Sequence, residues 1–358
     1  MKDKILVINP GSTSTKVAVF KNHTRIIEEN ILHSKEQLSL FPKIADQYEY
    51  RTGAVEKLLE MQGCPMEELL CISARGGLLR PLTKGGTYLV NEQMCRELMH
   101  AKHEHACNLG ALMALRIGKK LGIPAYIVDP VIIDEMSDLA KLSGYEGVRR
   151  KAMWHPLNQK AIARKAAALF GKTYQEINCI VAHLGGGITV GAHQKGRTID
   201  VNNGLDGDGP YSPERTGGLP NEALLNMVFD EGLTRDAVMK RLTGEGGCVS
   251  YLHTNDAREI EQMIESGDKK AELIFEGMAY QISKEISAMA AVMKGNVDAI
   301  ALTGGLAYSS RLTSWIRERV SFIAPVYLFP GEGEMEALNE GAKRVMDHLE
   351  EAILWQEN

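Results

Sequence analysis

A polar turn near the start of the chain has the residue types of a phosphate-binding site. It reads Asn9-Pro10-Gly11-Ser12-Thr13-Ser14-Thr15-Lys16 and lies between the apolar residues 5–8 and 17–20. Backbone N–H groups of a Gly/Ser/Thr turn can surround phosphate oxygens, and an amide oxygen such as that of Asn9 can face a hydrated Mg²⁺ ion. A Walker loop would open a helix here, whereas residues 17–20 are a short β-branched run, so we expect the turn to join two strands. We therefore predict a nucleotide-phosphate hairpin that includes Gly11, Ser12 and Ser14.

A second segment repeats this pattern in the middle of the chain. Residues 179–192 read CIVAHLGGGITVGA, which is an apolar run, a glycine turn and a second apolar run. The Rossmann spacing GxGxxG fails at Val190, and a strand follows the turn. A third glycine turn at residues 303–307 follows the apolar run 299–302 and could let the backbone lie flat against an adenosine. Two similar hairpins predict two similar domains that hold the nucleotide and its acceptor in the cleft between them.

The elements that position these turns alternate between strands and helices, which is typical of an α/β fold. We expect helices over residues 54–61, 94–99, 109–121, 157–170, 269–293 and 334–354, and strands over 125–128, 179–182 and 299–302. The strand over 125–128 would deliver Asp129 to its carboxyl end, a usual position for ligands in α/β sheets. At 358 residues two domains are expected, over 1–150 and 151–334, with a final helix at 335–358 packing back on the first.

Composition favours a small-molecule partner in a reducing compartment. The net charge of −5 gives no support for binding to nucleic acid or to an anionic membrane surface. Six scattered cysteines without a CxxC pair are typical of reduced thiols in the cytosol. The sequence contains no run of about 18 uncharged apolar residues and no apolar core of a signal peptide, so we expect a soluble cytoplasmic protein.

These motifs together resemble the acetate and butyrate kinases of the actin, sugar kinase and Hsp70 ATPase superfamily. The first signature is the turn at residues 9–16 and the second is residues 183–189; the likeness continues through residues 75–77, 127–129, 154–155, 213–216, 255–258 and 303–307. The chain is shorter than a typical acetate kinase, and its INPGSTSTK and SPERTGGLP segments are closer to butyrate kinase. The resemblance implies two duplicated actin-like ATPase domains of the ribonuclease H-like type, with a nucleotide cleft between them.

The same resemblance implies reversible phosphoryl transfer from ATP to a short-chain fatty acid, giving an acyl phosphate and ADP. Butyrate is the expected acid, with branched-chain acids, propionate and acetate as alternatives. A carboxylate with a pKa of about 4.3 is already ionised at neutral pH, so no general base is required. The difficulty is to bring one anion to another, and cations should therefore dominate the site.

By resemblance, Arg75 contacts the substrate carboxylate, while Arg215 and His155 stabilise the transferring phosphoryl group. Guanidinium groups bind carboxylate and phosphoryl oxygens at two points, which suits both arginines to this role. His105 would shape the carboxylate pocket, and Asp129 would orient Mg²⁺-bound water or the incoming group. The structural alternatives are surface arginines, a structural histidine and a turn aspartate before Pro130.

The resemblance also implies a nucleotide and metal site. Lys16 would reach an ATP phosphate, unless it is simply an exposed strand lysine. Asn9 would lie next to Mg²⁺ together with Glu332, for which Glu334 is the alternative, and either glutamate could instead cap a helix. Asp256 would contact the adenosine; the alternative is that it only caps the N-terminus of a helix. The remaining nucleotide contacts would be His183, Leu184, Gly185, Gly186, Gly187, Asp256, Arg258, Gly304, Gly305 and Leu306. Relatives form homodimers, so a homodimer or larger homo-oligomer is expected.

Two other function classes remain open from the sequence. A sugar kinase of the same superfamily would need a base such as Asp129 to activate a hydroxyl, which would leave two arginines at the acceptor unexplained. A non-catalytic, nucleotide-dependent binding protein would not need the set Asn9, Arg75, Asp129, His155 and Arg215. Comparing ADP release with butyrate and with glucose distinguishes a carboxylate kinase from a sugar kinase. Trapping the acyl phosphate as hydroxamate distinguishes it from a non-catalytic binding protein.

Overall fold

The computed structural model describes residues 2–101 and 104–356, and the chain divides into two compact units. The first unit is Met1–Asp134 with Gly333–Asn358, and the second is Glu135–Glu332. From the sequence, residues 135–150 are expected in the first domain, but they belong to the second unit. The reason is local: Glu135 forms an ion pair with Lys160, and the Ser137 N–H donates to the carbonyl of Ile199.

The first unit contains a seven-stranded sheet in the order β12-β5-β6-β4-β1-β2-β3. β1 pairs antiparallel with β2, and β2 with β3, whereas β1–β4 and β4–β6 are parallel pairs. Asn9 lies opposite Lys16 in the first hairpin, which confirms that the polar turn joins two strands. The strands are β1 Lys4–Pro10, β2 Ser14–Lys21, β3 Thr24–Leu32, β4 Leu69–Arg75, β5 Thr87–Leu89, β6 Ala125–Val128 and β12 Ile353–Leu354.

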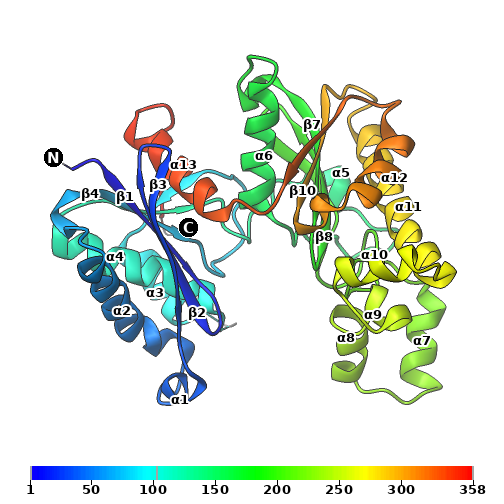
Figure 1. The fold of residues 1–358 in the computed structure, drawn as a ribbon, viewed down its shortest axis with the longest axis horizontal. Coiled ribbons are helices and arrows are strands. Elements are labelled where there is room, and N and C mark those ends of the chain that lie inside the picture. Colours follow the sequence, from blue (N-terminus) through cyan, green and yellow to red (C-terminus); the bar gives the residue numbers. More distant parts are fainter. Residues whose placement is uncertain (1, 102–103, 357–358) are drawn as a thin grey trace. The chain divides into compact units, whose positions relative to one another are not determined.

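Helices cover both faces of this sheet (Figure 1). α4 (Leu109–Leu121) packs where Ile72 and Ala74 face Gly118 and Gly110, and α13 (Glu334–Met346) packs on the opposite face, where the Ser73 hydroxyl donates to the Leu338 carbonyl at 2.7 Å. The other helices of the unit are α1 Lys35–Leu38, α2 Tyr48–Met61, which packs on α4, and α3 Glu92–Met99.

The final helix is shorter than the sequence predicts. α13 ends at Met346 instead of residue 354, because His348 adopts a left-handed conformation with φ of 58°. The chain then turns back, and Ile353–Leu354 pairs with β5 as an edge strand. Residues 357 and 358 of the predicted helix lie outside the described residues.

The second unit repeats the strand order of the first. Its five strands lie in the order β11-β10-β7-β8-β9. β7–β8 and β8–β9 are antiparallel and β7–β10 and β10–β11 are parallel, which matches β1, β2, β3, β4 and β6 pair by pair. The repeated topology confirms the duplication that the two glycine turns predict. The strands are β7 Asn178–Leu184, β8 Ile188–Gln194, β9 Arg197–Val201, β10 Ala299–Gly304 and β11 Val326–Pro330.

The two faces of this sheet pack against different helices, as Figure 1 shows for α6 on one side and α11 and α12 on the other. α6 (Pro156–Ala168) packs against Cys179 and Val181, whereas α11 (Lys269–Val292) packs on the face of Ile180 and Ala182. Alternate residues of β7 and β8 therefore point toward α6. The remaining helices are α5 Asp138–Lys141, α7 Asn221–Phe229, α8 Arg235–Thr243, α9 Gly247–Leu252, α10 Ala257–Glu265 and α12 Ser310–Val320.

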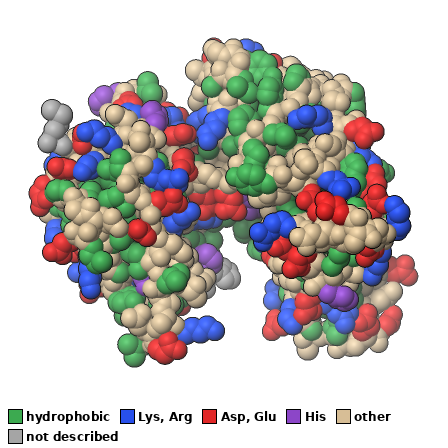
Figure 2. Space-filling model, in the orientation of Figure 1, with side chains coloured by type: hydrophobic (Ala, Val, Ile, Leu, Met, Phe, Trp, Pro, Cys, Tyr) green, Lys and Arg blue, Asp and Glu red, His purple; other side chains and the backbone are tan. Residues whose placement is uncertain are grey.

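The surface and the cysteines agree with the composition. On the face shown in Figure 2, basic and acidic side chains are interspersed over each unit. All six cysteines are buried free thiols. Within residues 2–101 and 104–356, no helix combines the length and the apolar character needed to cross a membrane.

Candidate functional site

The turn between β1 and β2 lines a pocket of about 580 Å³ in the first unit. This pocket brings together most of the first-unit residues selected from the sequence for metal, phosphate and carboxylate. It is lined by Asn9, Pro10, Gly11, Ser12, Ser14, Lys16, Asn30, Arg75, His105, Cys107 and Glu334. The ammonium of Lys16 pairs with Glu28 of β3 at 3.0 Å and is half exposed.

Arg75 and Asn9 meet at the start of α13. Arg75 is the last residue of β4, and Ser73, two residues earlier, contacts α13, so Arg75 lies on the same face of the sheet. Glu334, the first residue of α13, accepts hydrogen bonds from Arg75 Nη1 and, at 2.7 Å, from Asn9 Nδ2. The structure thus places Glu334 beside Asn9, whereas the sequence favoured Glu332.

His105 in this pocket is held as a neutral imidazole. Burial and the nearby Arg75 lower its pKa, and burial raises the pKa of Cys107 to about 11. The Cys107 thiol is therefore protonated and lies 2.9 Å from His105 Nδ1, to which the Cys107 backbone N–H donates at 3.2 Å. Nδ1 is then an acceptor, and the proton of the neutral ring is on Nε2, which suits His105 to donate to a carboxylate.

Arg51 supports the phosphate turn and was not found from the sequence. Its fully buried guanidinium donates from Nη1 to the carbonyls of Gly11 at 2.8 Å and Ser14 at 2.9 Å, and from Nη2 to Ser12 at 3.0 Å. No carboxylate pairs with it among the described residues, and its remaining hydrogen bonds go to Gln47 and to the Thr15 hydroxyl. A fixed positive charge therefore lies next to the residues expected to hold phosphate. The sequence contained one indication of this role: Arg51 lies on the same face of α2 as the apolar residues Val55 and Leu59, at i, i+4 spacing.

Asp129 does not line this pocket. It follows β6 in a left-handed conformation with φ of 39°, which is uncommon for a non-glycine residue, and its side chain is buried. Its Oδ1 accepts from the Gly86 N–H at 2.7 Å, and its own N–H donates to the Gly86 carbonyl. The carboxylate is thus engaged in holding the segment before β5.

A pocket of about 640 Å³ in the second unit gathers three segments selected for nucleotide binding. Gly185 and Gly186 come from the β7–β8 turn, Gly305 and Leu306 from the 3₁₀ turn Gly305–Tyr308, and Asp256 and Arg258 from the start of α10. The full lining is Gly185, Gly186, Pro213, Glu214, Asn255, Asp256, Ala257, Arg258, Glu261, Gly305, Leu306, Tyr308, Ser309 and Glu332.

Three of the residues selected from the sequence for nucleotide binding have structural roles. Asp256 caps α10, since its Oδ1 accepts from the Arg258 N–H at 2.9 Å, and the hydrogen bonds of Arg258 lower the pKa of Asp256 to about 2. The Leu184 side chain is in the core, and a Cβ on Gly304 would overlap the Leu184 carbonyl. Leu184 and Gly304 therefore shape the backbone behind the pocket instead of lining it.

Arg215 lies against the β7–β8 turn with its guanidinium partly unpaired. Nη1 donates to the carbonyl of Gly204, whereas the buried Nε has no hydrogen-bond partner among the described residues. Burial lowers the pKa of Arg215, and the charge of Glu214 opposes this shift. Glu214 itself accepts from Asn255 Nδ2 at 3.2 Å. A buried donor without a protein partner is suited to an anionic ligand.

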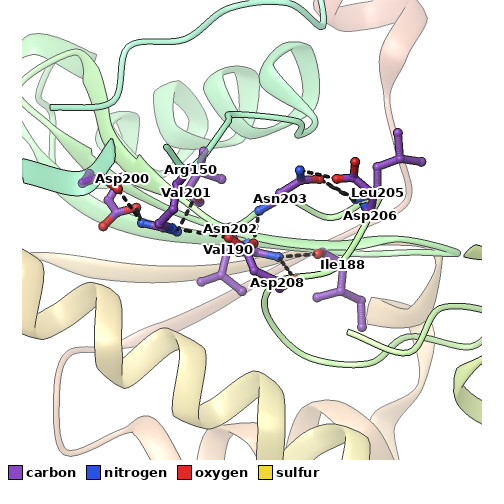
Figure 3. A network of polar contacts seen from close by, with 11 residues as sticks. Arg150, Ile188, Val190, Asp200, Val201, Asn202, Asn203, Leu205, Asp206 and Asp208 are labelled. Carbon is purple, nitrogen blue, oxygen red and sulfur yellow. Dashed lines mark hydrogen bonds and ion pairs between the residues drawn. The ribbon is translucent and has the colours of Figure 1, made fainter. Parts of the chain in front are cut away.

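The loop that carries Gly204 is anchored to β8 by Asn202, as Figure 3 shows. Asn202 Oδ1 accepts from the Val190 N–H at 2.6 Å, and its Nδ2 donates to the Ile188 carbonyl at 3.0 Å. Arg150 pairs with Asp200 of β9 at 2.8 Å and with Asp208, at the far end of the loop, at 3.3 Å. These contacts fix the carbonyl to which Arg215 donates.

His155 and His183 lie face to face beside the same turn. Their ring centroids are 3.8 Å apart and their planes differ by 14°. His155 is the residue before α6, and its Nδ1 lies 2.9 Å from Thr189 Oγ1. His183 Nδ1 lies 2.8 Å from Asn158 Oδ1 on α6. Neither Thr189 nor Asn158 was selected from the sequence as a site residue. Thr189 is the last residue of the second signature, whereas nothing separates Asn158 from other polar residues.

One family model matches more than half of the chain, and solved structures match its fold. A sequence model described as the Acetokinase family matches residues 138–344. An acetate kinase from Porphyromonas gingivalis has a TM-score of 0.75 at 21% identity, over 97% of this chain and 100% of that chain. A propionate kinase from Francisella tularensis subsp. tularensis SCHU S4 has a TM-score of 0.72 at 17% identity, over 95% and 98%.

A more distant likeness extends to sugar kinases. A ROK hexokinase from Thermus thermophilus matches with a TM-score of 0.51 at 14% identity, over 94% of this chain and 98% of that chain. At these identities the structural matches identify the fold alone. They confirm the predicted α/β class, and the two sheets of similar strand order agree with the predicted duplication.

Proposed function

Because the chain belongs to the acetokinase family, we propose that it is a butyrate kinase, which reversibly transfers a phosphoryl group from ATP to a short-chain fatty acid. The carboxylate oxygen forms a bond to the γ-phosphorus of ATP, and the bond from that phosphorus to the bridging oxygen breaks. The electron pair leaves with ADP, and the product is the acyl phosphate. No proton has to be removed from the acid, because it is ionised at neutral pH.

One observation carries this proposal: Arg75 lines the same pocket as the phosphate turn and His105. A guanidinium beside a neutral imidazole offers directional donors to a carboxylate, while a sugar hydroxyl would instead need a base. Asp129, the sequence candidate for such a base, is bound to the Gly86 N–H. The pocket therefore favours an anionic acceptor.

We propose that residues of the second unit bind the nucleotide and the transferring phosphoryl group. We assign the pocket formed by Gly186, Leu306 and Arg258 to the nucleoside and its phosphates. Arg215, with its unpaired buried Nε, would donate to the transferring phosphoryl group, and His155 would donate beside it. Groups aimed at developing charge act mainly in the transition state, which is the usual source of rate in phosphoryl transfer.

The residues around Asn9 fit a magnesium ion. Mg²⁺ prefers oxygen ligands and keeps several waters, so one or two carboxylates together with substrate phosphates usually suffice. Asn9 and Glu334 offer an amide and a carboxylate in one pocket, and within the described residues no group of three His, Cys, Asp or Glu forms a closed metal site. We therefore assign the metal role to Asn9 and Glu334 in place of Glu332. Bound Mg²⁺ would neutralise charge on the phosphate oxygens.

The preference for butyrate is supported by the INPGSTSTK and SPERTGGLP segments. One methylene in an apolar pocket changes binding by about 1 to 3 kcal/mol, so closely related acids will also react. The test is kcat/KM for acetate, propionate, butyrate, isobutyrate and valerate, with hydroxylamine to trap the acyl phosphate. A maximum at butyrate supports the proposal, and a maximum at another acid replaces the substrate.

The same assay separates the other classes. ADP release with glucose and none with any acid would indicate a sugar kinase, and tight ATP binding without hydroxamate would indicate a binding protein. We further propose that the enzyme is a homodimer or a larger closed assembly, which analytical ultracentrifugation of the full chain tests.

A further inference from the structure

A chain of buried hydrogen bonds leads from His155 into the second unit. It passes through Thr189, Gln159 and His193, which are fully buried, to Tyr174, which is 3% exposed. Thr189 and His193 lie on the β8 face that points to α6, where Gln159 is located. A Cβ on Gly191, which lies between them on β8, would overlap Gln159 Oε1, so this glycine makes room for the amide.

The backbone determines how the Gln159 amide is oriented. Gln159 Nε2 lies 3.0 Å from the Thr189 carbonyl oxygen, which can only accept. The amide nitrogen must therefore face Thr189, and the amide oxygen faces His193 Nε2 at 3.0 Å. His193 Nε2 is the donor in that contact and carries a proton.

The far end of the chain keeps His193 neutral. Burial, reinforced by the charges of Lys160 and Arg164, lowers the pKa of His193 well below its usual range, while burial raises the pKa of Tyr174. The phenol thus retains its proton and lies 2.8 Å from His193 Nδ1, to which it donates. The donor and the acceptor are then determined for both hydrogen bonds, from Tyr174 to His193 and from His193 to Gln159.

The Thr189 hydroxyl passes this direction to His155. Its oxygen accepts from Gln159 Nε2 at 2.7 Å, and its hydrogen points to His155 Nδ1 at 2.9 Å. An Nδ1 that accepts leaves the proton of the neutral ring on Nε2. The other tautomer would place a second donor at the hydroxyl and leave the hydroxyl hydrogen without its acceptor.

We propose that Thr189, Gln159, His193 and Tyr174 are positioning residues that hold His155 as its Nε2–H tautomer, the form that donates to the transferring phosphoryl group. The catalytic use of this tautomer rests on the proposed function, whereas the tautomer itself does not. The chain would keep the donor in place before the nucleotide arrives, so no ring rotation or proton exchange is needed during transfer.

The first test is the nitrogen chemical shifts of the His155 ring in the ¹⁵N-labelled full-length protein, assigned with His155→Gln. We expect a protonated Nε2 and an unprotonated, accepting Nδ1 in the unsubstituted protein. A protonated Nδ1 on a neutral ring would overturn the proposal, and this measurement on the unsubstituted protein does not depend on activity.

The second test compares Thr189→Val, which keeps the β-branched shape, with Thr189→Ser, which restores the hydroxyl. If the valine variant populates the active tautomer at about a tenth, kcat should fall roughly tenfold while KM for ATP stays within about twofold. Thr189→Ser should recover the tautomer and most of kcat. Loss of the Nε2–H tautomer in Thr189→Val with kcat unchanged would disprove its catalytic use. A correct tautomer in a protein that phosphorylates no acid would instead refute the proposed function and leave the positioning intact.

Discussion

Gly187 and Arg215 are packed so closely that the guanidinium of Arg215 occupies the place where a side chain at residue 187 would begin. A Cβ built on Gly187 would overlap Nη1 and approach Cζ of Arg215 to 2.7 Å. The last glycine of the β7–β8 turn is therefore required by the arginine beside it, and not by the conformation of its own backbone. This contact places a cation against the second glycine turn.

Gly187→Ala should lower kcat at least tenfold, because the methyl group displaces Arg215 from its position at the turn. Steady-state kinetics with ATP and butyrate check this. The losses of kcat in Gly187→Ala and Arg215→Ala should not add in the double variant. Gly53→Ala is the matched control, since a Cβ there meets nothing within 4 Å in the middle of α2. It should leave kcat unchanged and stabilise the protein by about 0.5 to 1 kcal/mol. Full kcat in Gly187→Ala would contradict the role of Arg215.

Arg75→Ala should raise KM for the acid by roughly ten- to a hundredfold, because a hydrogen bond to a charged group contributes about 1.5 to 3 kcal/mol. KM for ATP should change little, since the assigned nucleoside pocket lies in the second unit. The measurement is initial velocity against butyrate at saturating ATP. An unchanged KM for the acid would remove Arg75 from the acceptor site.

Glu334→Gln should raise the Mg²⁺ concentration needed for half-maximal activity roughly tenfold, because it replaces a carboxylate beside Asn9 with a weaker ligand. Glu336→Gln, two residues along α13, removes only a surface pair with Arg25 and should leave the Mg²⁺ requirement unchanged. Glu332→Gln should also leave it unchanged, because Glu332 lines the second-unit pocket. If only Glu332→Gln raises the Mg²⁺ concentration needed for half-maximal activity, Glu332 is the metal ligand, as favoured from the sequence.

Arg51→Met should weaken both stability and ATP binding. The carbonyls of Gly11, Ser12 and Ser14 lose a buried donor, so we expect the free energy of unfolding to fall by roughly 1 to 3 kcal/mol and KM for ATP to rise. Urea unfolding and kinetics at pH 7 measure the two effects. Arg116→Met serves as the control, because Arg116 forms an exposed ion pair with Glu49, and such surface pairs contribute little to stability. Equal effects in both variants would exclude a specific role for Arg51.

Glu285→Gln should alter how stability depends on pH. Burial and the charge of Asp208 raise the pKa of Glu285 to about 7, and Asp200 adds to this while Arg150 opposes it. The folded protein therefore holds this proton more tightly than the unfolded chain, and the stabilisation it provides is lost as the pH rises through about 7. Relative to Glu285→Gln, the unsubstituted protein should lose roughly 3 kcal/mol of unfolding free energy between pH 4 and 8. A constant difference between the two urea-unfolding curves across this range would show that Glu285 titrates normally.

Local patterns in the sequence were sufficient for most individual elements. The helix over 109–121 and the strand over 125–128 match α4 and β6 at both ends, because Gly122 with its φ of 63° and the apolar run that follows are local signals. The end of α13 was missed, because pairing of residues 353–354 with β5, far away in the sequence, decides it. The boundary at residue 134 depends likewise on the ion pair of Glu135 with Lys160.

The sequence by itself determined the two hairpins, their duplication, the α/β class and the types of residue available for chemistry, since strand periodicity and glycine turns are encoded over a few neighbouring residues. Tertiary structure alone decided which side chains meet: Glu334 with Asn9, Arg51 beneath the phosphate turn, Arg215 against Gly187, and Thr189 with His155. Each of these pairs joins residues from different elements, and such contacts depend on how helices pack on a sheet, which no local pattern records.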